Sequence, residues 1–230
     1  ELLIDHAWGW EPCTMEAVKA YRPESNSLSS GQVLQSAYDV RKARVVVMEM
    51  ADAIALDLVS KRLVTDQLVL NISYDCESLK DPKVCSRYQG EIAIDHYGRQ
   101  APKPAHGTAN LGRFTSSSRI IVDAVMGIYD QVVNPDLLVR RINITTNHVV
   151  DEKRATEQRQ PLQLDLFTDY EELERKNKAE QQTLAKERKM QEALLSIKEK
   201  FGKNAILKGT SFEEGATARE RNQQIGGHKA

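Results

Sequence analysis

The sequence has few cysteines, few aromatic residues and no long apolar run, and each shortage excludes a class of protein. The cysteines are Cys13, Cys76 and Cys85, an odd number with no Cys-x-x-Cys pair, which argues against a disulfide framework and against a zinc site. No stretch approaches the roughly 18 to 20 apolar residues that span a bilayer, and no signal peptide opens the chain. We therefore expect a cytoplasmic protein from a reducing compartment, without a membrane partner.

An excess of charge of one sign is also missing. The chain has 32 Lys and Arg against 33 Asp and Glu, so any affinity for nucleic acid must come from local patches. Charged residues make up 28% and aromatic residues 6%, which indicates that the globular part does not fill the length of 230 residues. The first residue is Glu1 and not Met, so we expect a piece cut from a longer chain.

Alternating strands and amphipathic helices occupy the middle of the chain. Residues 27–35 are a short strand candidate, and Asp39 then caps a helix that runs to about Lys61. Residues 65–75 alternate as a half-buried strand, with Leu68, Leu70, Ile72 and Tyr74 on one side and Gln67, Asn71 and Ser73 on the other. Residues 107–118 form another strand that ends in helix-capping serines. A second helix over 120–129 follows. The last strand, over 137–149, places Leu138, Ile142 and Ile144 on one side and Arg141, Asn143, Thr145 and Asn147 on the other. The order predicts an α+β fold, a four-stranded sheet with two helices on one face.

The flanking segments lack the regular apolar periodicity of this middle part. Residues 1–26 indicate the end of an upstream domain plus a linker, residues 27–150 the folded domain, residues 151–168 a linker, and residues 169–230 a polar tail that is helical or disordered. Thr168 and Glu171 predict a capping box that opens the tail helix, and Gly202 ends it. The predicted apolar stripe of this helix is Met190, Leu194, Ile197 and Phe201. Residues 218–230 show no periodicity, and we expect them to be disordered.

The sheet face that the helices leave uncovered is the candidate binding surface. No Asp or Glu occurs in residues 96–122 or 137–150, although both stretches carry arginines, so this part of the sheet is locally basic. Amides, hydroxyls and arginines suit phosphate and sugar oxygens. The candidate DNA contacts are Ser30, Asn71, Ser73, Arg113, Thr115, Ser116, Arg140, Arg141, Asn143 and Thr145. A polar face that simply meets water explains the same pattern. Base stacking of the kind used by RNA-recognition modules is disfavoured, because the exposed positions are not aromatic.

Catalytic chemistry has little support in the sequence. The five histidines lie far apart, with no spacing that links two of them as metal ligands. The adjacent hydroxyls of Ser116 to Ser118 head a helix and have no evident base beside them. We therefore assign no catalytic residue, no metal ligand and no cofactor to this chain.

The linker contains a short apolar stretch, QPLQLDLFTD, at residues 160–169. Leu162, Leu164 and Leu166 alternate with polar neighbours, as they would in a half-buried strand. The same residues also fit a docking peptide that anchors on a partner. Composition alone leaves both interpretations open.

A family resemblance is carried by the segments HAWGWEPCTMEAVKAYRP, SLSSGQVL, GTANLGRFTSSSRIIVDAV and LLVRRINITTNHV. They resemble the C-terminal portion of a bacterial Y-family translesion DNA polymerase of the DinB/UmuC type, over about residues 1–170. In that family this region is the little finger, which grips the duplex backbone in the major groove. The first twenty or so residues then resemble the end of the thumb.

The resemblance implies partners and excludes activity of the chain by itself. Gln163, Leu164, Asp165, Leu166 and Phe167 match the QLxLF pentapeptide by which bacterial polymerases dock on the sliding clamp. Magnesium is implied for the parent polymerase alone, because the family's palm carboxylates hold two metal ions and precede the little finger. The implied role is damage tolerance and DNA repair in the SOS response. The alternatives are a stand-alone nucleic-acid-binding protein and a pure interaction module whose polar face binds nothing.

Overall fold

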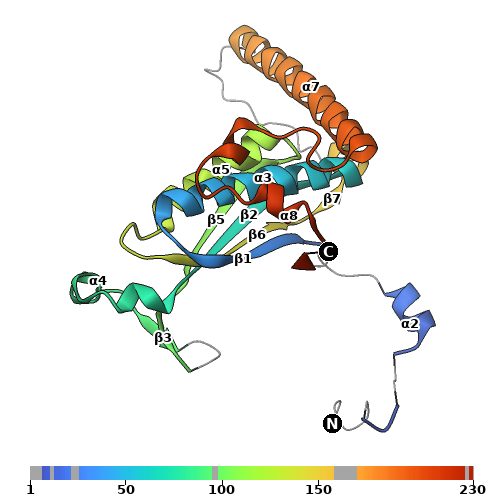
Figure 1. Cartoon of the computed structure of the whole chain (residues 1–230). Helices are drawn as coiled ribbons and strands as arrows, with labels where there is room; N and C mark the ends of the chain where they lie inside the picture. Colours follow the sequence, from blue (N-terminus) through green and yellow to red (C-terminus); the bar gives the residue numbers. More distant parts are fainter. Residues whose placement is uncertain are drawn as a thin grey trace.

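A computed structural model describes residues 7–10, 13–21, 26–94, 98–157, 170–225 and 228–229, and shows an α+β chain (Figure 1). The α+β class agrees with the prediction from the sequence. In chain order the elements are α2 (Met15–Ala20), β1 (Leu28–Tyr38), α3 (Val40–Lys61), β2 (Leu63–Tyr74), η1 (Cys76–Leu79), α4 (Pro82–Arg87), β3 (Ile92–Ile94), β4 (Gln100–Pro102), β5 (Ala105–Thr115), α5 (Ser118–Val132), β6 (Val139–Asn147), β7 (Val150–Asp151), α6 (Glu152–Glu157), α7 (Tyr170–Phe201), η2 (Gly209–Phe212), α8 (Ala218–Arg221), β8 (Gln224–Ile225) and β9 (His228–Lys229).

The central sheet is antiparallel, with the strand order β1-β6-β2-β5, and β7 pairs with the start of β2. Strands β1 and β2 therefore run parallel on the two sides of β6, and α3 connects them. In the same way β5 and β6 lie on the two sides of β2, and α5 connects them. Each β-α-β unit encloses one strand of the other, so the two units interlock. Helices α3 and α5 lie beside each other across one face of the sheet (Figure 1).

Both helices begin where the sequence predicts. The Asp39 carboxylate accepts hydrogen bonds from the backbone N–H groups of Arg41 and Lys42, which are free donors in the first turn of α3. The Ser117 hydroxyl accepts one from Ile120 N and caps α5. The apolar faces of these helices and the inner side chains of β2 and β6 form one core. Its largest fully buried members are Tyr129, Leu34, Met50, Leu58, Leu68, Leu70, Ile72, Ile121, Leu137, Ile142, Ile144 and Val46.

One core position differs from the predicted alternation of β6. We expected Leu138 to point inward with Ile142 and Ile144, but Leu138 is only partly covered, whereas Leu137 and Val139 are buried. The cause is an irregularity in the pairing of β2 with β6: Ser73 lies opposite Arg141, and Tyr74 opposite Val139. A bulge of this kind shifts the alternation by one residue. Period-two reasoning from sequence cannot locate such a shift.

Gly107 lets helix α5 lie close to strand β5. A Cβ at this position would overlap Ile128 Cγ2 and would stand 3.0 Å from Val132 Cγ1, and both side chains belong to α5. The strand therefore needs a residue without a side chain where the helix crosses it.

The stretch between β2 and β5, rich in proline and glycine, folds as a separate projection. It contains η1, α4 and the hairpin of β3 with β4, none of which the sequence analysis had placed. Figure 1 shows it beyond one end of the sheet, whereas α7 lies toward the other end.

Helix α7 contacts the domain partly through polar residues. Of the apolar stripe predicted from the sequence, Leu194 and Ile197 are half-buried, whereas Met190 and Phe201 are 61% and 68% exposed. Glu187, Arg188 and Gln191 contact the start of α5, and Gln191 is only 3% exposed. The first turn of a helix presents N–H groups without partners, so polar side chains are suited to cover it. An apolar pattern search does not detect a docking face of this type.

The segment after α7 packs on α3, although we expected residues 218–230 to be disordered. Residues 218–221 form α8, and the buried Glu49 carboxylate of α3 accepts hydrogen bonds from the N–H groups of Thr217 and Ala218 at 2.8 and 3.0 Å. Lys208 also forms an ion pair with Asp52 of α3 at 2.6 Å. The anchoring groups come from another element of the chain, so the local sequence gave no periodic signal. None of the helices in the described residues is both long and apolar enough to cross a membrane.

Candidate nucleic-acid interface

The sheet face opposite α3 and α5 is lined by side chains that alternate with buried ones. Strand pairing brings them into register: Asn143 lies opposite Gly31 on one side and Asn71 on the other, and Asn71 lies opposite His106. We call this set the open sheet face. Its side chains are Ser29, Val33, Gln67, Val69, Asn71, Ser73, His106, Thr108, Asn110, Arg141, Asn143, Thr145 and Asn147. Most of the set are hydroxyls and amides, joined by Val33, Val69, His106 and Arg141, and it contains no carboxylate.

Hydrogen bonds order the amides of the open sheet face. Asn147 Nδ2 donates to Gln67 Oε1 at 2.9 Å, and Gln67 Nε2 donates to Asn110 Oδ1 at 2.8 Å, which links β6, β2 and β5 in one row. In a second row, His106 Nδ1 donates to Asn71 Oδ1 at 2.6 Å. Side chains that are already ordered lose less conformational freedom when they bind a ligand. The rows thus form a prepared surface of hydrogen-bonding groups.

Arg141 is the cation of this face. It is exposed, it lies in register with Ser73 and Val33, and its guanidinium makes no hydrogen bond or ion pair with any residue in the described ranges. A guanidinium presents five N–H donors in a planar fork that suits phosphate oxygens. Such a guanidinium can bind a phosphate group, while the neighbouring amides and hydroxyls form hydrogen bonds with the oxygens of the same phosphate and its sugar.

Five predicted contact residues lie on the open sheet face, namely Asn71, Ser73, Arg141, Asn143 and Thr145. Two others are tethered or turned away from it. Ser30 pairs with buried Ile144, so it points toward the helix-covered face. Arg140 donates to Gln35 O at 2.9 Å and lies 3.7 Å from the Asp75 carboxylate. These two residues are less available to a ligand than we expected.

The remaining predicted contacts lie where β5 leads into α5, next to α7. Thr115 and Ser116 are buried there, which contradicts our expectation that they are open to DNA. Ser116 Oγ accepts a hydrogen bond from Arg188 of α7 at 3.2 Å. Arg113 donates to Glu180 of α7 at 2.6 Å, and this hydrogen bond and the charge attraction raise the pKa of Arg113 and lower the pKa of Glu180. Both groups are therefore ionised at neutral pH.

Several members of the face were not among the contacts predicted from the sequence: Gln67, His106, Thr108, Asn110 and Asn147. A signal for three of them was present, because the stretch AHGTAN alternates small or apolar residues with polar ones, as a half-exposed strand does. Gln67 and Asn147 also occupied outward positions of their strands in the predicted alternation. Their mutual hydrogen bonds were not predictable, since these depend on which strands are neighbours.

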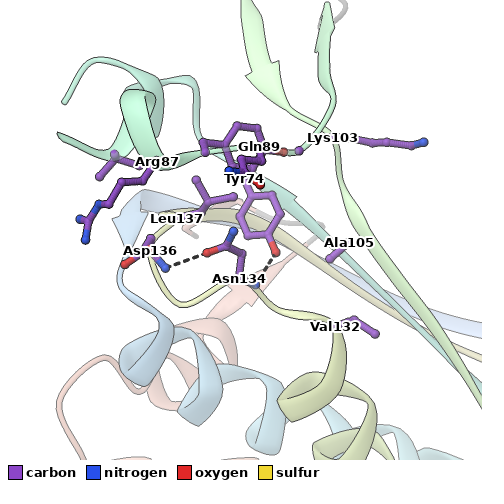
Figure 2. A pocket seen from close by; sticks show the side chains of 12 residues that line it. Tyr74, Arg87, Gln89, Lys103, Ala105, Val132, Asn134, Asp136 and Leu137 are labelled. Atoms are coloured by element: carbon purple, nitrogen blue, oxygen red, sulfur yellow. Dashed lines mark hydrogen bonds between the residues drawn. The ribbon is translucent and has the colours of Figure 1, made fainter. Parts of the chain in front are cut away.

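A pocket of about 440 Å³ lies at the end of the sheet next to the projection (Figure 2). Tyr74 points into it, and its hydroxyl accepts a hydrogen bond from Asn134 N at 2.9 Å, while Asn134 Oδ1 accepts one from Asp136 N. Arg87 and Lys103 extend away from Tyr74 in this view. The polar groups drawn here stabilise the turn before β6, and we assign no chemistry to them. Across the described ranges, no group of three or more His, Cys, Asp and Glu side chains is placed to hold a metal ion.

The motif at residues 163–167 and the predicted cap at Thr168 lie outside the described residues. No family model matches the chain, and no curated protein matches it. The open sheet face and the sequence motifs themselves are therefore the features from which a function can be inferred.

Proposed function

We propose that this chain is the DNA-gripping and clamp-docking end of a bacterial Y-family translesion DNA polymerase of the DinB/UmuC type. The observation that supports this most directly is the guanidinium of Arg141, which has no partner among the described residues and lies within ordered rows of amides and hydroxyls. Contacts of this type hold the phosphate and sugar backbone and read no bases. A grip that is indifferent to bases tolerates a damaged template, as translesion synthesis requires.

In this proposal residues 27–150 are the little finger and residues 1–26 the end of the thumb. The sheet would lie against the duplex with its open face, while α3 and α5 stiffen it from behind. Polymerisation itself would need palm carboxylates with magnesium, which align the primer hydroxyl and the incoming nucleotide. This chain supplies no such group in the proposal, and its contribution to synthesis is to hold the duplex and to reach the sliding clamp.

Replacing Arg141 with Ala should weaken binding of duplex DNA by about the same factor on unrelated sequences. Each phosphate contact releases counterions, so the slope of log K against log salt should fall by about 0.9 for the one lost contact. Fluorescence anisotropy with two duplexes of different sequence, measured across a salt series, checks both effects. Asn143→Ala should lose less, because a neutral hydrogen bond contributes only about 0.5 to 1.5 kcal/mol net.

Arg44→Ala is the matched control, because it removes the same charge from the helix layer. Arg44 lies on α3 and pairs with Asp130 of α5 at 3.2 Å, behind the sheet. Its loss should leave both the affinity and the salt slope near those of the unchanged chain. Equal behaviour of the two arginine variants would show that the open sheet face does not contact the DNA.

A further inference from the structure

Helix α7 places two carboxylates against the segment that joins β5 to α5. Glu180 Oε1 accepts a hydrogen bond from Arg113 at 2.6 Å. Two turns further along, Glu187 Oε2 accepts one from the Ser117 hydroxyl at 2.6 Å, and Glu187 Oε1 accepts one from Arg119 N at 2.9 Å. A guanidinium, a hydroxyl and a backbone N–H are the same donors that proteins offer to DNA phosphates.

The contact between α7 and this segment is polar, which makes it separable. Arg188 donates hydrogen bonds to Ser116 Oγ and to the Glu152 carboxylate. Gln191 donates to Ser116 O and to Ser118 Oγ, both at 3.0 Å. The large apolar residues Met190 and Phe201 stay exposed, while Leu194 and Ile197 are half-buried and α7 also contacts α3. The Arg113–Glu180 pair is itself 42% and 41% exposed, and an exposed ion pair changes an equilibrium constant by about fivefold at most. A polyanion can therefore displace Glu180 from Arg113.

Arg113 lies just beyond the open sheet face. It follows Asn110, the last residue of that face on β5, and Gly112, whose φ of +68° marks an irregularity at the end of the strand. Its guanidinium is the charged group that the end of β5 presents, three residues after Asn110. In the structure this cation is already neutralised by the chain's own tail.

We propose that α7 is an intramolecular competitor of DNA, which restrains the grip by holding Arg113 in an ion pair with Glu180. This inference rests on the proposed function, since it concerns the regulation of the same DNA surface. Full binding then requires a DNA phosphate to replace Glu180, with α7 loosened from the start of α5. The tail thus lowers the affinity for DNA until a phosphate displaces Glu180; we call this effect the brake.

The test is the affinity of the whole chain for duplex DNA after Glu180→Gln. The variant keeps the size of the side chain but removes the charge, so Arg113 loses its ion pair, and binding at low salt should tighten about two- to fivefold. Adding Arg113→Ala to Glu180→Gln should remove the gain. Thermal melting confirms that each variant is folded.

Glu174→Gln is the control for a general charge effect. Glu174 lies on the same helix and is exposed, so its loss changes the net charge of α7 by the same amount without touching Arg113. Equal DNA affinities of the Glu180 and Glu174 variants, with Arg141→Ala still weakening binding, would reject the brake. The proposed DNA-binding function would then still hold. An inert Arg141→Ala would instead overturn the proposed function, and the brake with it.

Amide hydrogen exchange provides a second measurement that needs no variant. Saturating duplex DNA should speed exchange in α7, because the helix loses its contacts with Ser116, Ser117 and Arg119. Exchange in α3, beneath the sheet, should not become faster. Unchanged or slowed exchange of α7 in the DNA complex would show that DNA and α7 do not compete.

Discussion

Replacing Leu166 and Phe167 with Ala is expected to abolish capture of the chain by a bacterial sliding clamp and to leave its melting temperature unchanged. A short peptide has little area, so a few large apolar anchors that enter pockets carry most of its binding energy. Gln163 would fix the register with its amide. Ordering the linker opposes binding, so we expect micromolar affinity for the unchanged chain, about −8 kcal/mol. Surface plasmon resonance on immobilised clamp, combined with thermal melting, measures both quantities.

Leu162→Ala is the control within the same linker, because Leu162 lies outside the pentapeptide and its loss should not change clamp binding. The other interpretation of this stretch, a half-buried strand, predicts the reverse result. Removing two core side chains would then destabilise the fold by several kcal/mol. Unfolding of the double variant, or clamp binding that survives it, would exclude the docking peptide.

Gly107→Ala is expected to destabilise the domain by about 2 kcal/mol, since forcing an extra carbon into a packed core typically costs 1 to 3 kcal/mol. The new Cβ would meet Ile128 Cγ2 and Val132 Cγ1. Both neighbours are β-branched residues in a helix, where one side-chain rotamer is strongly preferred, so neither turns aside easily. For a domain of this size the melting temperature should fall by roughly 4 to 8 °C.

Gly127→Ala makes the same chemical change on the exposed side of α5. A Cβ there would meet nothing within 4 Å, and Ala is favoured over Gly inside a helix by about 0.5 to 1 kcal/mol. The melting temperature of this variant should therefore rise. A fall in both variants, or in neither, would mean that the close approach of α5 to β5 does not restrict position 107.

The sequence by itself determined the elements of the central domain. Asp39 and the serines before α5 predicted the two helix starts, and alternation assigned most inward side chains of β2 and β6, including Leu68, Leu70 and Ile142. It also indicated the open polar surface around Asn71, Arg141 and Asn143. These features depend on neighbours a few residues apart, because caps and side-chain periodicity are local properties of the chain.

Only the tertiary structure decided which groups of that surface are free. Arg141 and Arg113 look equivalent in the sequence, yet Arg141 has no partner in the described ranges, whereas Arg113 is paired with Glu180, and Ser116 is buried against Arg188. Likewise Glu49 holds the start of α8 from a helix that lies far away in sequence. The reason is physical: a polar contact between distant segments needs only one matched donor and acceptor, so it leaves no periodic pattern in either segment.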